Sequence, residues 1–130
     1  MTVLSINERI IRAKDKAGLS DVDFEVLRVS KSSAKVLNEM AAYVVSVMNT
    51  EDTEESPFDP LEFRVYNATD DSGDYIADAT ITLGGPTVTV RYEASRDVAV
   101  ISYHWCSDFL EVSTRNAPIV EIIKTHSTYF

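Results

Sequence analysis

The sequence has little cysteine: Cys106 is the single one among 130 residues. One cysteine forms no internal disulfide and cannot build a cysteine-based zinc site. A lone thiol is typical of a reducing compartment, so we expect a cytoplasmic protein. Long apolar runs are also missing, since Met40 to Val45 is far shorter than the roughly 20 residues of a membrane span. The N-terminal residues lack the cleavage pattern of a signal peptide, and we expect no membrane contact.

Motifs for phosphate binding and catalysis are missing as well. The sequence contains no Gly-x-Gly-x-x-Gly, no P-loop, no Gly-x-Ser-x-Gly and no His-Glu-x-x-His. Gly84 and Gly85 lie between two predicted strands and do not open a helix, so they have no phosphate-binding context. We therefore expect a non-enzymatic protein without a cofactor or a metal.

Negative charge is concentrated in one part of the chain. The net charge is −9, and residues 49–78 hold ten acidic side chains against one basic side chain, Arg64. The segments on either side are close to neutral. Binding to nucleic acids and to anionic membranes needs a basic surface, so direct contact with either is not expected.

The acidic segment is expected either to keep the protein soluble or to bind a basic protein surface, because opposite charges steer association. A sharper version is nucleic-acid mimicry, in which carboxylates occupy the groove of a nucleic-acid-binding protein. The chain resembles the small anti-restriction and anti-CRISPR proteins of phages in size and charge, and in no sequence motif. That resemblance implies an inhibitory, anti-defence role. The expected partner-binding residues are Glu51, Asp52, Glu54, Glu55, Asp59, Asp70, Asp71 and Asp74.

The hydrophobic patterning predicts one α+β domain, an antiparallel four-stranded β-meander packed against N-terminal helices and a short C-terminal helix. Its predicted parts are a mainly helical part (1–48), an acidic connection (49–60), the meander (61–113) and a C-terminal helix (117–126). The four strands are predicted near 62–66, 77–83, 87–93 and 98–105. Residues 21–30 fit a helix or a strand, and their valines and phenylalanine favour a strand.

The helices have recognisable ends and faces. Ser5 and Glu8 have the spacing of a capping box for the first helix, and Asn116 is a plausible cap for the last. The second helix, from Ser32 to about Met48, has the clearest buried face. We expect that face to contain Leu37, Met40, Ala41, Val44, Val45, Val47 and Met48.

A thiol or metal enzyme is the main catalytic alternative. His104, Cys106 and Asp108 share one face if the strand continues through them, and a cysteine nucleophile needs a nearby base. His126 is the only other histidine that could complete such a site or join His104 at a metal. The acidic turn 70–74 has clustered oxygen ligands but not the spacing of a calcium loop.

Two further alternatives concern the aromatic residues. Tyr103, Trp105, Tyr129 and Phe130 are candidates for a homodimer or ligand surface, since aromatics are enriched at interfaces. A pocket for a small anionic ligand or nucleotide would use Tyr103 and Trp105 with Arg91 or Arg115. An acidic dimeric chaperone is the last alternative.

Overall fold

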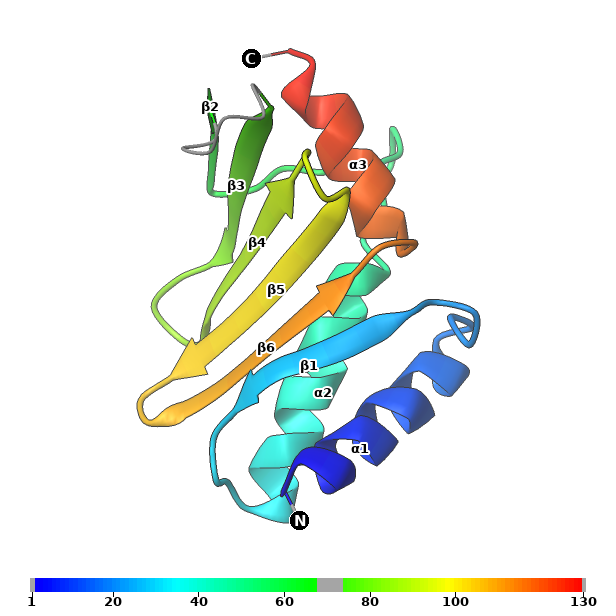
Figure 1. Ribbon diagram of the computed structural model, residues 1–130, viewed down its shortest axis with the longest axis vertical. Coiled ribbons are helices and arrows are strands. Elements are labelled where there is room, and N and C mark those ends of the chain that lie inside the picture. Colours follow the sequence, from blue (N-terminus) through cyan, green and yellow to red (C-terminus); the bar gives the residue numbers. More distant parts are fainter. Residues whose placement is uncertain (1, 68–73, 130) are drawn as a thin grey trace.

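The computed structural model describes residues 2–67 and 74–129. In this part of the chain it contains three helices and six strands (Figure 1). In chain order they are α1 (Thr2–Lys16), β1 (Phe24–Val29), α2 (Ala34–Met48), β2 (Glu62–Asn67), β3 (Tyr75–Thr82), β4 (Thr87–Glu93), β5 (Val98–Trp105), β6 (Asp108–Thr114) and α3 (Pro118–Ser127). The α+β class is confirmed. None of these helices has both the length and the apolar character needed to cross a bilayer.

The six strands form one antiparallel sheet in the order β1-β6-β5-β4-β3-β2. Strands β2 to β6 follow one another as a meander, and β1 joins the far edge beside β6. The prediction of four strands is wrong by two. The ambiguous segment 21–30 contains β1, as its composition favoured, and residues 108–114 form an additional strand, β6.

The additional strand follows a turn without a recognisable sequence signal. Trp105 pairs with Asp108, so the chain reverses over only two residues. Cys106 takes a left-handed backbone conformation, with φ of 53°. Glycine, asparagine or aspartate usually holds such a position. The sequence has a cysteine there, so none of these residue types marks the first position of the turn between β5 and β6.

All three helices lie against one face of the sheet. Helix α2 packs on β5 and β6, α1 packs on α2 and β1, and α3 packs on β4 and β5. The seven α2 residues predicted to be buried are all buried. Burial of such side chains contributes about 1.5–3 kcal/mol each before conformational entropy is subtracted. The other face of the sheet, called the open face below, bears polar and charged side chains such as Thr89 and Arg91.

Two helix starts differ from the sequence prediction. Helix α1 begins at Thr2, so Ser5 lies inside it and accepts a hydrogen bond from Nε of Arg9 at 3.2 Å. Helix α3 follows Ala117, and Asn116 is not its cap. The Asn116 side chain instead accepts from the backbone N–H of Asp23 at 2.7 Å and donates to the carbonyl of Asp21 at 3.0 Å. The asparagine therefore ties the start of α3 to the start of β1.

Candidate functional site

The acidic loop, residues 49–60, connects α2 to β2 and passes behind α3 in Figure 1. Its backbone is held by hydrogen bonds within the loop. Thr53 and Ser56 close a small turn, in which the Thr53 N–H donates to the Ser56 carbonyl at 3.1 Å and the Ser56 N–H donates to the Thr53 hydroxyl at 2.9 Å. The carboxylate of Asp52 accepts from the backbone N–H of Phe58 at 3.0 Å. These bonds give the loop a defined shape.

Phe58 attaches the loop to the body of the protein. Its side chain is only 8% exposed. The ring lies edge-on to the rings of Phe63 on β2, at 6.4 Å, and His126 on α3, at 5.2 Å. Edge-to-face aromatic pairs of this kind add about 0.5–1.5 kcal/mol to the effect of burial. The loop was expected to be an exposed connection, and Phe58 is the residue for which that expectation is wrong.

The carboxylates of the acidic loop face solvent. Glu51, Asp52, Glu54, Glu55 and Asp59 are all exposed. Among the residues that the structure describes, no ion pair involves any of these five. The four acids at 51–55 border a shallow open hollow together with Thr53. The loop therefore presents negative charge that no cation of the described residues neutralises, from a backbone held by its own hydrogen bonds.

The rest of the acidic segment is arranged differently. Glu62 and Asp78 lie on the open face, where both form ion pairs with arginine. Asp74 is half-buried just before β3. Asp70 and Asp71, and most of the turn considered for calcium, lie outside the described residues. Within the described part of the chain, the exposed and unpaired acidic surface expected over 51–78 therefore narrows to 51–59.

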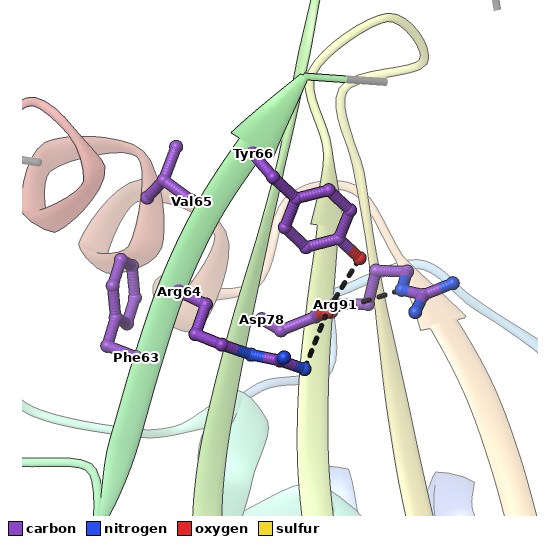
Figure 2. A pocket seen from close by; sticks show the side chains of 6 residues that line it. All are labelled: Phe63, Arg64, Val65, Tyr66, Asp78 and Arg91. Atoms are coloured by element: carbon purple, nitrogen blue, oxygen red, sulfur yellow. Dashed lines mark hydrogen bonds and ion pairs between the residues drawn. The ribbon is translucent and has the colours of Figure 1, made fainter. Parts of the chain in front are cut away.

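A second polar cluster lies on the open face, around Asp78 on β3 (Figure 2). Its carboxylate accepts hydrogen bonds from the Tyr66 hydroxyl at 2.7 Å and from Nε of Arg91 at 3.1 Å. A guanidinium nitrogen of Arg64 lies 4.0 Å away, and Arg64 also pairs with Glu62 at 3.3 Å. The hydrogen bond to Asp78 raises the pKa of Tyr66, and the same carboxylate raises the pKa of Arg91.

The Asp78 cluster borders a hollow of about 710 Å³ that extends around β2, an edge strand of the sheet. Figure 2 shows Arg64 and Tyr66 on one side of β2, and Phe63 and Val65 on the other. The two arginines and the two carboxylates of this cluster balance in charge. The cluster therefore holds the edge strand in place but adds no net charge that would attract an anion.

The thiol and metal alternatives find little geometric support. Cys106 lies in the β5–β6 turn, so the assumption of one continuous strand through 104–108 is wrong. His104 is on the open face, where its ring stacks on Phe109 at 6.2 Å. Asp108 pairs with Trp105 on the helix-covered side and accepts a hydrogen bond from the Ser32 hydroxyl at 2.5 Å. The three side chains therefore do not converge.

The second histidine is remote from the first. His126, near the C-terminal end of α3, packs against Phe63 at 4.6 Å. Figure 1 shows that this end of α3 lies away from the β5–β6 turn. Across residues 2–67 and 74–129, no group of three or more histidines, cysteines or acids has the spacing to hold a metal ion.

The four aromatic residues expected to form one surface are separated. Tyr103 and Trp105 lie near the end of β5, where Tyr103 is buried and Trp105 is 44% exposed. Tyr129 is 80% exposed and follows α3 at the other end of the molecule. Phe130 lies outside the described residues.

The arginines of the expected anion pocket are separated from the aromatic residues too. Arg91 pairs with Val100 in the β4–β5 ladder, five positions from Trp105, and points to the open face. Arg115 donates to the carbonyl of Arg96 at 2.9 Å. The geometry therefore does not assemble the pocket expected from Tyr103, Trp105 and an arginine.

Sequence reasoning missed Phe58 and the Asp78 cluster. An aromatic residue between two prolines, in the segment SPFDP, is a weak signal for an anchor. In the sequence, Arg64, Asp78 and Arg91 alternate with apolar residues, and this pattern indicates only that each lies on the polar side of its own strand. Only the strand register, which pairs Arg64 with Asp78 and Asp78 with Arg91, brings them together.

Comparisons of this chain with protein-family models, with curated proteins and with solved structures found no match.

Proposed function

We propose that this protein is a non-catalytic binding protein that inhibits or regulates a basic protein partner through its acidic loop. The observation that carries the proposal is a set of five exposed carboxylates, none in an ion pair with another described residue, on a loop that Phe58 and Asp52 hold in shape. A loop that is already held in shape loses little conformational entropy on binding. Little of the favourable interaction of its charges is therefore offset by ordering of the loop. Unpaired surface charges also accelerate association with an oppositely charged surface.

A nucleic-acid-binding protein is the kind of partner that suits the loop best. Duplex DNA presents one negative charge about every 1.7 Å along its axis, and its protein partners match it with clustered lysine and arginine. Four carboxylates in the five residues 51–55 offer a comparable local density of negative charge. The binding would be inhibitory, because the loop would occupy the groove that the nucleic acid needs. The single cysteine suits action in the cytoplasm.

The test compares variants that differ only in where charge is removed. The loop variant carries Glu51→Gln, Glu54→Gln and Glu55→Gln. It keeps Asp52, because Asp52 accepts the Phe58 hydrogen bond. The control variant carries Glu8→Gln, Asp21→Asn and Glu25→Gln, three exposed acids with no ion pair among the described residues. Both variants lose three negative charges, so net charge cannot explain a difference between them.

Each protein is immobilised and used to capture partners from the native host at low salt, followed by elution at high salt. We expect the wild type and the control variant to retain the same basic protein, and the loop variant to lose it. Exposed charge pairs are screened by salt, so the retained partner should elute at high ionic strength. Retention of the same partner by the loop variant would refute the proposal.

A further inference from the structure

A groove with aromatic walls lies at the end of the domain where β5 meets β6. It has a volume of about 360 Å³ and lies between α2, from Val36 to Tyr43, the β3–β4 turn and the β5–β6 hairpin. Its lining includes Glu39, Tyr43, Pro86, Tyr103, Trp105 and Asp108. None of these residues belongs to the acidic loop, so the groove is a separate feature of the molecule.

The aromatic rings of the groove are held in place but remain accessible. Tyr43 and Tyr103 pack with ring centroids 5.4 Å apart and planes tilted by 53°. The Trp105 indole lies beside Gly85, so close that a Cβ added to the glycine would be 3.1 Å from Cζ3 of the ring. Tyr43 is 39% exposed and Trp105 is 44% exposed. Two of the three rings thus present surface that the fold itself does not cover.

Two carboxylates accompany the rings. Asp108 is fixed by the hydrogen bond from Ser32, and Glu39 is exposed on α2. Neither carboxylate takes part in an ion pair among the described residues. Burial raises the pKa of Tyr103, and the nearby negative charges of Glu39 and Asp108 raise it further. The carboxylates of Glu39 and Asp108 therefore both contribute negative charge to the part of the groove that Tyr103 lines.

Aromatic faces and carboxylates together define the chemistry of the occupant. A cation gains from the negative face of tyrosine or tryptophan within about 6 Å of the ring centroid. Among cationic side chains, the planar guanidinium of arginine stacks on an aromatic face and pairs with a carboxylate at the same time. Leu83, which is 60% exposed in the adjoining turn, offers an apolar contact for the chain that carries such a side chain.

We propose that this groove binds an arginine side chain of a polypeptide partner, stacked on Trp105 and Tyr43 and paired with Glu39 and Asp108. The proposal does not rest on the function of the acidic loop, because the two sites share no residue. A partner that bound the groove and the acidic loop at the same time would bind more tightly than through either site alone.

Trp105 is the only tryptophan of the chain, so its fluorescence reports directly on the groove. The probe is a blocked Gly-Arg-Gly tripeptide, and its control is the same peptide with citrulline, which keeps the shape of arginine without its charge. We expect a saturable change in Trp105 fluorescence with the arginine peptide, with a dissociation constant on the order of 1 mM, and none with the citrulline peptide. Equal responses to the two peptides, or no saturable response to arginine, would overturn the proposal.

Variants locate the binding. Glu39→Gln should weaken the binding of the arginine peptide about fivefold, because the substitution removes one of the two carboxylates of the groove. Glu8→Gln, an equal loss of charge on the exposed side of α1, should change the affinity by less than about twofold. The loop variant with three glutamines should bind the peptide like the wild type, which separates failure of this site from failure of the acidic loop. If Glu8→Gln weakened binding as much as Glu39→Gln, the attraction would be non-specific and the groove would not be the site.

Discussion

The carboxylate of Asp52 accepts a hydrogen bond from the backbone N–H of Phe58 at 3.0 Å and so closes the acidic loop onto the residue that anchors it. Phe58 and Asp52 hold the loop in different ways. Phe58 contributes buried apolar area and two ring contacts, whereas Asp52 fixes the backbone between them. The exposed acids of the loop depend on both for their arrangement.

Phe58→Ala should lower the free energy of unfolding by about 3 kcal/mol. This value is at the lower end of the range for truncation of a buried phenylalanine, because Phe58 lies at the edge of the core. Urea unfolding followed by circular dichroism measures the change. Phe58→Leu, which keeps most of the apolar volume, should cost clearly less. If the two substitutions were equally mild, Phe58 would not be the anchor of the loop.

Substitutions at Asp52 separate charge from hydrogen bonding. Asp52→Asn keeps an acceptor for the Phe58 N–H, whereas Asp52→Ala removes it. We expect Asp52→Ala to cost about 1 kcal/mol and Asp52→Asn distinctly less. Hydrogen exchange of the Phe58 amide should accelerate in the alanine variant only. Equal exchange rates in the two variants would show that the hydrogen bond does not hold the loop.

Substitutions at Cys106 test the hairpin that the sequence did not reveal. With φ at 53°, this position favours glycine or asparagine and disfavours a β-branched residue. Cys106→Val should lower the free energy of unfolding by about 1–2 kcal/mol, whereas Cys106→Asn should be close to neutral. Thermal unfolding of both variants provides the comparison. A fully stable valine variant would contradict the left-handed turn.

The pH dependence of stability should show the pair formed by Tyr92 and Asp97. The Tyr92 hydroxyl donates to the Asp97 carboxylate at 2.6 Å, and this bond lowers the pKa of Asp97. The contribution of Asp97 is therefore present above the pKa of the unfolded carboxyl and is lost as the pH falls through the lowered value. Tyr92→Phe should return the pKa of Asp97 toward its ordinary value and reduce the acid dependence. Carbon-detected NMR titration of the Asp97 carboxyl measures that pKa, and an unchanged value in the variant would contradict the assignment.

At alkaline pH, the stability of the protein depends on the ionisation of the Tyr92 hydroxyl. Burial raises the pKa of its hydroxyl, and the bond to Asp97 raises it further. Because the folded pKa lies above the unfolded value, this contribution is complete below the unfolded pKa and is lost as the pH rises through the folded one. Stability should therefore fall above about pH 10, and less so in Tyr92→Phe. Urea unfolding across pH 8–11 measures this dependence, and identical curves for the two proteins would refute it.

Local patterning was enough to predict much of this fold. The three-and-four spacing of Leu37, Met40 and Val44 identified the buried face of α2, because a helix brings such positions onto one side. Alternation of apolar and polar residues identified β2, β3 and β4 in the same way, and a run that is apolar on both faces identified β5. Features that depend on pairing between distant strands were not predictable. The Asp78 cluster needs three strands in register, and β1 needs its partner β6 across more than eighty residues.

In the candidate site, too, the features that depend on local sequence were predictable, and those that depend on contacts between distant residues were not. Composition located the exposed acids at 51–55, because an unpatterned, proline-flanked and highly charged segment has no apolar face to bury. It could not show that Asp78 is neutralised by Arg64 and Arg91, since that depends on the register of the sheet. It also gave no reason to connect Glu39 and Tyr43 on α2 with Trp105 on β5, which only packing brings together.

The central claim is tested most directly by the dissociation constant of the captured basic partner, measured by titration calorimetry at two salt concentrations. The wild type, the loop variant and the control variant are compared under identical conditions. We predict that the loop variant binds about tenfold more weakly and with a smaller salt dependence, while the control variant stays within about twofold of the wild type. Equal affinities for the loop and control variants would contradict the assignment of binding to the acidic loop.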